Sequence, residues 1–422
     1  MNEKSHSLLG RIWLWMLSIG PGIFCIGYTV GTGSVTSMAK AGSQFGMELL
    51  WVLVLSCFFS WTLMEAYGRY AIVTGNTSIY SFKTKIRGGK WIALLVVVGI
   101  IIAQWNSLSG ILGLSANALY EVAVLFFPGL PQENYWAILG IAIFLVVVMY
   151  GFLLVGQYSF FEKVLVVFVT LMGISFIISM FVVLPDPIAI AKGLKPSIPA
   201  VPGGKLLVAA FVGTTMAAPT FVVRPLLMKG KGWTQQHTKE QSKDALLSAS
   251  LMLVINLAIM AAAAGSLFVE GKTIEKVMDM VYTLEPIAGK FAVVIFMTGA
   301  LSAGLSSIFP ILMVAPLLVA DYKEGVLDTA STRFRVLTGV ACVVGLTVPI
   351  LGANPILAQI LTQVAAVFIL PVVIGCIFYL INRRDLMQAH KAGIWLNMGL
   401  GAALIFSVLI SYTGFLALRE MF

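Results

Sequence analysis

Charged residues are scarce in this 422-residue chain. Lysine, arginine, aspartate and glutamate make up 11% of it, and 59% of the residues are hydrophobic. A typical soluble domain has roughly 25% charged residues. The apolar residues form repeated runs of the length that crosses a bilayer, for which about 20 residues suffice. The alternating strands of a membrane β-barrel are absent. The composition therefore predicts an all-α membrane protein.

Histidine and cysteine, the common ligands and nucleophiles of enzymes, are also rare. The three histidines lie in predicted tails or loops, and the four cysteines lie inside apolar runs without a CxxC pair. Neither an HExxH motif nor a phosphate-binding GxxxxGK[ST] motif occurs, so the sequence argues against a metalloprotease and against an ATP-driven pump in one chain. We therefore expect a protein that is not an enzyme and needs no cofactor.

The net charge of +9 points to the membrane and not to nucleic acid. The basic residues flank the apolar runs, and 19 of the 27 Lys and Arg residues fall on the side of the N-terminus. Cytoplasmic loops carry such an excess. The sequence therefore predicts a multi-pass protein of the cell membrane with a cytoplasmic N-terminus. The expected membrane is a bacterial inner membrane. The bilayer and a small ion or solute are the expected partners, with no obligatory protein partner.

The apolar runs predict eleven membrane spans in one domain, residues 1–422, with short connections between them. The expected spans are 16–38, 46–72, 91–119, 135–155, 160–184, 205–228, 245–269, 287–320, 336–352, 354–381 and 393–417.

Two of these spans are interrupted. The first reads TVGTGS from Thr29 to Ser34, and the sixth has Gly213 before two threonines and Pro219 shortly after them. Glycine costs a helix about 1 kcal/mol and proline removes a backbone donor. Irregular backbone at membrane depth survives only where it is buried or lines a cavity. Tight helix packing is one explanation, but matching breaks in two halves indicate a transporter's midplane site.

The positions of the breaks also predict two repeats. Spans one and six begin two groups of five spans, residues 16–184 and 205–381, and residues 393–417 form an extra helix. Because five is odd, the two groups would lie inverted in the membrane.

Several stretches resemble the NRAMP (natural resistance-associated macrophage protein) transporters. The similar segments are GPG at 20–22, AGSQFGMELLWVLVLS at 41–56, GLKPSIP at 193–199, NLAIMAAAA from Asn256, SAGLSS from Ser302 and TQVAAVFILP from Thr362. The resemblance implies a LeuT-type fold with broken helices 1 and 6, and a secondary transporter of metal cations that works by alternating access.

The resemblance also identifies candidate binding positions, several of them altered. The family's Asp-Pro-Gly-Asn break falls here on a run with neither Asp nor Asn, and its metal-binding Met falls on an alanine. The third span, where the family carries acids, has none here. The expected substrate-binding residues are Gly31, Thr32, Gly33, Ser34, Thr214, Thr215, Ala217 and Gln363.

The chemistry of these positions leaves the substrate open. Mn and Fe favour carboxylate, imidazole or sulfur ligands, whereas this site offers hydroxyls, carbonyls and one amide. We therefore doubt selective proton-coupled transport of Mn or Fe, and the identity of any bound metal is unknown. The alternative is a sodium-coupled or uncoupled transporter of a small anionic or zwitterionic solute, held by helix N-termini. An ion channel would need a pore motif that is not visible.

Three further polar residues are candidates for the transport pathway. Asn106 lies in the third span, and Arg224 either faces inward or extends to the cytoplasmic interface. Glu65 lies four residues before Arg69 in the second span, a spacing that favours an ion pair.

Overall fold

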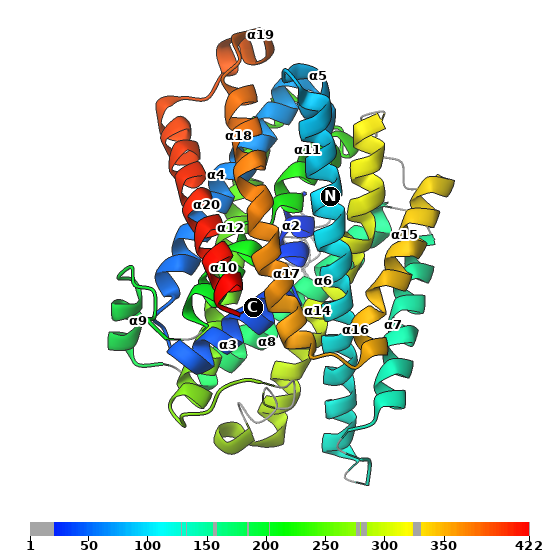
Figure 1. Ribbon diagram of the computed structural model, residues 1–422, viewed down its shortest axis with the longest axis vertical. Coiled ribbons are helices and arrows are strands. Elements are labelled where there is room, and N and C mark those ends of the chain that lie inside the picture. The colour runs from blue at the N-terminus through cyan, green and yellow to red at the C-terminus, as the bar shows by residue number, and fades with distance from the viewer. Residues whose placement is uncertain are drawn as a thin grey trace, which may run out of the picture.

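The computed structural model describes residues 21–127, 129–131, 133–154, 158–183, 185–201, 203–275, 279, 285–323 and 331–421, and all regular elements among them are helices (Figure 1). The elements of the first part are α2 (Gly22–Thr29), α3 (Thr32–Phe45), α4 (Leu50–Thr74), α5 (Ser78–Lys85), α6 (Gly89–Phe126), α7 (Tyr135–Leu154), α8 (Tyr158–Val182) and α9 (Pro187–Gly193).

The second part begins with another broken helix. Its elements are α10 (Gly204–Thr215), α11 (Ala218–Gly230), η1 (Gln235–His237), α12 (Thr238–Ala263), η2 (Ala264–Phe268), α14 (Glu285–Lys323), α15 (Thr332–Gly345), α16 (Thr347–Leu351), α17 (Pro355–Ala366), η3 (Val367–Ile369), α18 (Leu370–Ile381), α19 (Arg384–Met387), η4 (Gln388–His390) and α20 (Ile394–Met421).

Within the described part of the chain, ten helical segments are long and apolar enough to cross a membrane. The first predicted span is an addition to these ten, because its break divides it into α2 with 8 residues and α3 with 14. Residues 16–20 of that predicted span lie outside the described residues. The arrangement agrees with the eleven predicted spans.

The broken helices occupy the centre of the bundle. In the most apolar 18-residue stretch of the α10–α11 segment, 94% of the residues are buried, compared with 28% in the corresponding stretch of α7. α3 packs against α10, and α2 packs against α11. Every described residue of α2 is buried. A helix without a lipid-facing side can carry polar groups, and this is where the candidate binding residues lie.

The structure differs from the predicted spans in several details, of which three follow. α6 continues to Phe126, past the predicted end at 119. The ninth span divides at Leu346 into α15 and α16, and the tenth contains the 3₁₀ turn Val367–Ile369. The tenth span is therefore a third interrupted helix, an interruption that was not predicted from the sequence although Pro371 follows the turn.

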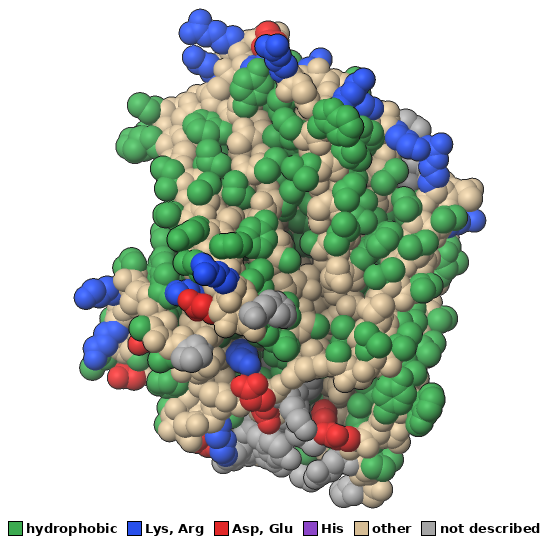
Figure 2. Space-filling model, in the orientation of Figure 1, with side chains coloured by type: hydrophobic (Ala, Val, Ile, Leu, Met, Phe, Trp, Pro, Cys, Tyr) green, Lys and Arg blue, Asp and Glu red, His purple; other side chains and the backbone are tan. Residues whose placement is uncertain are grey.

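Lysine and arginine side chains gather at one end of the molecule, where α5, α18 and α19 lie (top of Figures 1 and 2). Lys83 and Lys85 end α5. Because cytoplasmic loops are rich in such residues, we refer to this end as the predicted cytoplasmic end.

Candidate functional site

The first helix break is shaped by close packing against α14. α2 ends at Thr29, Val30 follows it, and Gly31 is the N-cap of α3. A Cβ atom on Gly31 would lie 1.8 Å from the Ser307 hydroxyl oxygen. Only glycine fits there without displacing Ser307, so the glycine allows α14 to approach the unwound backbone.

A small network of hydroxyl groups joins the two broken helices. Ser34 Oγ donates to the Thr29 carbonyl at 2.7 Å and lies 3.0 Å from Thr214 Oγ1. Thr214 Oγ1 also lies 3.1 Å from the same carbonyl, to which it can donate. The backbone group freed by the break therefore finds its partners inside the protein, as burial in lipid requires.

The second break brings α10 against α17. α10 ends at Thr215, and Ala217 is the N-cap of α11. A Cβ atom on Gly213 would lie 1.9 Å from the carbonyl oxygen of Gln363. Since that neighbour is backbone, the contact cannot relax by a side-chain rotation. Gly213 thus sets the distance between α10 and α17.

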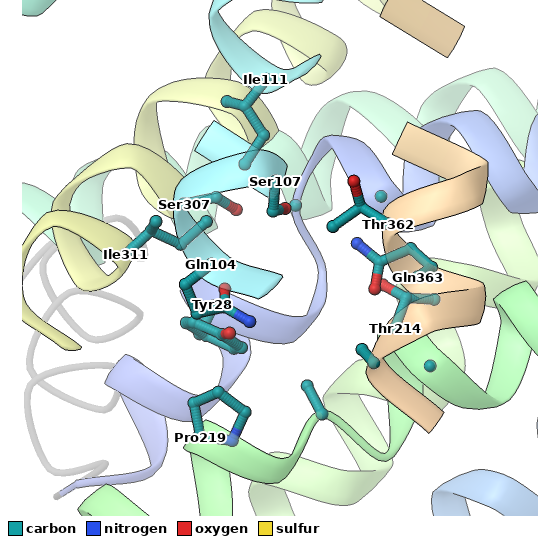
Figure 3. A pocket seen from close by; sticks show the side chains of 15 residues that line it. Tyr28, Gln104, Ser107, Ile111, Thr214, Pro219, Ser307, Ile311, Thr362 and Gln363 are labelled. Atoms are coloured by element: carbon teal, nitrogen blue, oxygen red, sulfur yellow. The ribbon is translucent and has the colours of Figure 1, made fainter. Parts of the chain in front are cut away.

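A narrow cavity lies where these elements meet. Tyr28, Gly31, Gly33, Thr214 and Gln363 line it, with further groups from α6 and α14 (Figure 3). The space open to the centre of a water molecule is about 20 Å³. One water needs on the order of 10–15 Å³ by this measure, so the cavity in this conformation has room for a bare ion or a single water.

The described lining combines polar and apolar groups and carries no charge. Its polar groups are hydroxyls, amides and backbone, and no Asp, Glu, Lys, Arg, His, Cys or Met is among the described lining residues. Met216 is fully buried outside the lining. Across the part of the chain that the structure describes, no three His, Cys, Asp or Glu residues cluster as a metal site.

Helix ends of both polarities meet at the cavity. Gly31 and Ala217 are N-caps of α3 and α11, neither helix has a side-chain cap, and both residues line the cavity. Uncapped N-termini carry partial positive charge and free N–H groups, whereas helix C-termini such as that of α2 carry partial negative charge. The surroundings can therefore interact with ions of either sign.

The structure brings together most of the predicted binding residues. Gly31, Gly33, Thr214, Ala217 and Gln363 line the cavity. Ser34 supports it through the Thr214 contact. The side chain of Thr32 lies outside the described residues.

Thr215 and Asn106 point elsewhere. The Thr215 hydroxyl donates to the Phe211 carbonyl of its own helix, and Thr215 does not line the cavity. Asn106 is exposed on the surface of α6 and donates to the Ile102 carbonyl. Residues of one helix separated by one or two positions face different directions, which explains both differences.

Several polar residues that the sequence did not single out as binding residues also line the cavity, three of them from α6 and α14. Gln104 and Ser107 reach the cavity from α6, and Ser307 reaches it from α14. Gln104 Oε1 is buried without a hydrogen-bond partner among the described residues. The signal available in the sequence was a lone glutamine within an uncharged span.

Arg224 and Glu65 belong to a separate buried network. Arg224 is fully buried and its Nη2 lies 2.7 Å from Asp244 Oδ2. It also donates to Gln241 Oε1 at 3.1 Å, and Gln241 Nε2 donates to Glu65 Oε2 at 2.8 Å. The prediction of a Glu65–Arg69 pair is confirmed at 2.8 Å.

The position of Arg224 distinguishes between the two alternatives that the sequence left open. Its side chain does not extend to the interface, because Asp244 and Gln241 hold it inside the bundle. Neither Arg224 nor Glu65 lines the central cavity. The Asp244 carboxylate also accepts from the Gly22 backbone N–H at 3.2 Å, so the network attaches the start of α2 to α11 and α12.

Comparisons with known proteins agree with this architecture. The family profile described as natural resistance-associated macrophage protein-like matches residues 22–417. The chain is similar to the divalent metal cation transporter MntH of Deinococcus radiodurans, at 23% identity over 88% of this chain and 83% of that protein. It is similar to MntH of Klebsiella pneumoniae at 24% identity, over 96% and 94% of the two chains.

Solved structures show the same fold. The manganese transporter of Eremococcus coleocola matches with a TM-score of 0.71 and 16% identity, over 97% of this chain and 87% of that chain. MhsT in complex with L-phenylalanine matches with a TM-score of 0.66 and 13% identity, over 99% and 100% of the two chains. These likenesses confirm the predicted LeuT-type fold.

Proposed function

The chain belongs to the natural resistance-associated macrophage protein family of membrane transporters, and we propose that it moves a small ion by alternating access through the neutral central cavity. The cavity lies between both broken helices, α6, α14 and α17. Substrate sites of such folds lie at discontinuous helices, and rocking of one repeat against the other exposes them to either side. Residues 16–184 and 205–381 are the proposed repeats.

The observation that carries the proposal is the uncharged lining of the cavity. Relatives are described as transporters of divalent metal cations, but a divalent ion here would meet no carboxylate, imidazole or sulfur among the described lining residues. One missing charge at about 4 Å is worth roughly 4 kcal/mol at an effective dielectric constant of 20. That energy corresponds to roughly a thousandfold in affinity, so selective proton-coupled uptake of Mn or Fe is not expected.

A second candidate cargo is a small anionic or zwitterionic solute. The uncapped N-termini of α3 and α11 at the cavity favour a negatively charged group. The small volume of the cavity favours an ion over any solute of several atoms in this conformation. A solute would require the cavity to widen when α17 and the half-helices move.

Transport by purified protein in liposomes tests the proposal. We expect saturable uptake of a small ion, with uptake of Mn²⁺ weak or absent, in parallel assays with Mn²⁺, Mg²⁺ and Na⁺. Amino acids and small carboxylates in a sodium gradient test the second cargo. Strong, saturable Mn²⁺ uptake by the unmodified chain would overturn the interpretation of the cavity.

Restoring a charged ligand gives a matched gain-of-function test. The resemblance places Gly31 at the position of the family's Asp, but a Cβ atom added there would clash with Ser307. The double substitution Gly31→Asp with Ser307→Gly removes the clash and should raise Mn²⁺ affinity. The control, Gly31→Asn with Ser307→Gly, has nearly the same shape without the charge and should leave Mn²⁺ uptake low.

A further inference from the structure

A second and larger cavity lies at the predicted cytoplasmic end, apart from the central cavity. The space open to the centre of a water molecule is about 550 Å³ there, compared with about 20 Å³ at the central cavity. Three segments far apart in the sequence line this second space, which we call the loop cavity: Arg69 and Val73 on α4, residues 235, 236 and 238 around η1, and residues 389–391 after α19 (top of Figure 1). Pockets for small molecules have volumes of this order, so the loop cavity has room for more than a simple ion.

The ionisable side chains of the loop cavity are all basic. Arg69, His390 and Lys391 line it, and no Asp or Glu is among its described lining residues. The Lys391 ammonium has no acidic partner within the described part of the chain. Like charges that share a cavity repel one another, and an anion between them turns this repulsion into attraction. The loop cavity therefore favours a negatively charged ligand.

Arg69 has unused hydrogen-bond donors at the loop cavity. Its side chain is 32% exposed, and its Nη2 donates to Glu65 Oε1 at 2.8 Å. The other N–H groups of the guanidinium meet no acceptor among the described residues. A guanidinium has five donors in a planar fork that matches the oxygens of phosphate in pairs. One part of the guanidinium is therefore held by the protein, and the rest is available to an anion.

The loop that carries His390 and Lys391 has an unusual backbone. Gln388, two residues earlier, has φ 49° and ψ −122°, and it is the one non-glycine residue with a positive φ in the described part of the chain. Such a conformation is costly and persists only where the surrounding structure imposes it. The base of the loop is closed by the Ala392 N–H, which donates to the Ile381 carbonyl at 3.3 Å. The two basic residues are therefore positioned before a ligand binds, which lowers the entropy cost of binding.

These features favour a phosphate group over a carboxylate. A phosphate group carries about −1.5 to −2 charges at pH 7 and has three acceptor oxygens. The loop cavity offers several basic groups, and Gln235 and Gln236 add neutral amide donors. Val73 and Ala389 add apolar surface beside them. A small molecule that carries a phosphate group matches both the charge and the volume.

Side chains connect the loop cavity to the start of α2. Arg69 pairs with Glu65, and Glu65 Oε2 accepts from Gln241 Nε2 at 2.8 Å. Gln241 Oε1 in turn accepts from Arg224 at 3.1 Å, within the network that attaches α2 to α11 and α12. A phosphate that binds Arg69 competes with Glu65 for the guanidinium and leaves the buried Glu65 carboxylate with fewer partners. Occupancy of the loop cavity therefore weakens the network that holds α2.

We propose that the loop cavity binds a phosphate group, of a small phosphorylated molecule or of a lipid headgroup, through Arg69, His390 and Lys391, and that the bound phosphate loosens the attachment of α2. This inference goes beyond the proposed function. It does not rest on transport, because phosphate binding and the release of α2 are both measured without a cargo.

Binding of ³²P-labelled pyrophosphate to the purified full-length protein in detergent tests the site. The salt concentration is set to about 0.15 M, where charges more than about 8 Å away are largely screened. We expect saturable binding to the unmodified protein. Arg69→Gln and Lys391→Gln should each weaken it by roughly 10-fold or more, the effect of losing one charged hydrogen-bond partner.

The matched control is Arg384→Gln. Arg384 is exposed on α19, in the same connection as Lys391, and it does not line the loop cavity. This variant loses the same charge and should bind pyrophosphate like the unmodified protein. If Arg69→Gln does not fold, as judged by gel filtration, Lys391→Gln decides the question, because Lys391 is exposed. Unchanged affinity in Lys391→Gln, or an equal loss in Arg384→Gln, would overturn the site.

Nanodiscs distinguish the two sources of the phosphate group. Pyrophosphate binding is compared in discs of phosphatidylcholine with and without phosphatidic acid. Competition by phosphatidic acid would support the site and assign it to a lipid headgroup, whereas binding without competition would support a soluble phosphorylated molecule. Absence of saturable pyrophosphate binding both in detergent and in phosphatidylcholine discs would refute the phosphate site.

Cys25 reports on the attachment of α2. It lies on α2, is fully buried, and its sulfur is 3.9 Å from Arg224 Nη1. In a variant with the other three cysteines replaced by alanine, the rate of maleimide labelling measures how often α2 separates from α11. Saturating pyrophosphate should raise this rate by roughly 5-fold or more, as for a coupling of usual strength, and adding Lys391→Gln should abolish the increase at the same concentration. Labelling that pyrophosphate does not change would refute the effect on α2 and leave the phosphate site.

Discussion

The broken helices take part in two polar regions of opposite character. At the cavity, Thr214 and Gln363 offer a hydroxyl and an amide beside open space, and Ser34 supports Thr214 from behind. Toward the predicted cytoplasmic end, Arg224 and Asp244 form a buried ion pair with both side chains at most 3% exposed. The first region is neutral and hollow, whereas the second is charged and packed.

The difference shows how the same helices can offer contacts for a cargo in one region and be fixed to their neighbours in the other. A site that must release its cargo benefits from modest, neutral contacts, each worth about 0.5–1.5 kcal/mol. A buried pair of opposite charges is costly to separate, because each charge alone is left without water. An ionisable residue in a membrane is a functional candidate by default. Here the charged partners secure α2, α11 and α12, and the proposed transport site lies with the uncharged residues.

The largest effect is expected from breaking the charged region. Asp244→Asn leaves the Arg224 guanidinium buried without its counter-ion and should destabilise the protein by about 3–5 kcal/mol, measured as the midpoint of thermal unfolding in detergent. The double variant Arg224→Met with Asp244→Leu removes both charges and should recover most of the loss. A single variant as stable as the unmodified protein would contradict the role given to the pair.

A smaller loss is expected from disturbing the packing at the cavity. Gly213→Ala places a methyl group against the Gln363 carbonyl and forces α10 away from α17, at a cost of about 1–3 kcal/mol for overpacking. Uptake should fall with it, because the cavity wall moves. The matched control is Gly375→Ala in α18, where a Cβ meets nothing within 4 Å. Equal behaviour of the two variants would contradict the close approach.

The sequence reveals these two regions to different degrees. The helix breaks were predictable, because Gly31, Gly33 and Pro219 interrupt apolar runs in chemically recognisable ways. The Glu65–Arg69 pair followed from its spacing on one helix. The ion-pair partner of Arg224 could not be predicted from the sequence, because Asp244 lies on the next long helix and only tertiary packing brings the two side chains together.

The direction of side chains was the second feature that could not be predicted from the sequence. In a span without charged residues, such as that around Asn106, no polar face shows which side points inward. Gln104 and Ser107 face the cavity while Asn106 lies on the surface. The same limit separated Thr214 from Thr215. Which of two neighbouring threonines faces the cavity depends on the rotation of the helix about its axis, and the packing partners of the helix set that rotation.

Thr214 and Thr215 offer a paired test of the neutral region. Thr214→Val removes a hydroxyl that joins the two broken helices and should weaken the apparent affinity for cargo by roughly 3- to 10-fold, as expected for one hydrogen bond. Thr215→Val has the same shape change but affects a hydroxyl that bonds only its own helix, so uptake should stay near the unmodified level. Both are measured as initial uptake rates against cargo concentration. The reverse ranking would exclude Thr214 from the site.

The smallest effect is expected where the charged network approaches the surface. Glu65→Gln keeps an oxygen that can accept from Gln241, and Arg69, whose side chain is 32% exposed, can turn to water. The loss should be about 1 kcal/mol, the net contribution of one hydrogen bond, because Arg69 regains contact with water, and high salt should reduce it further. Unfolding midpoints at low and high salt measure it. If Glu65→Gln instead cost as much as Asp244→Asn at both salt concentrations, the network would act as one cooperative unit, and the deeper burial of the Arg224–Asp244 pair would not make it the stronger end.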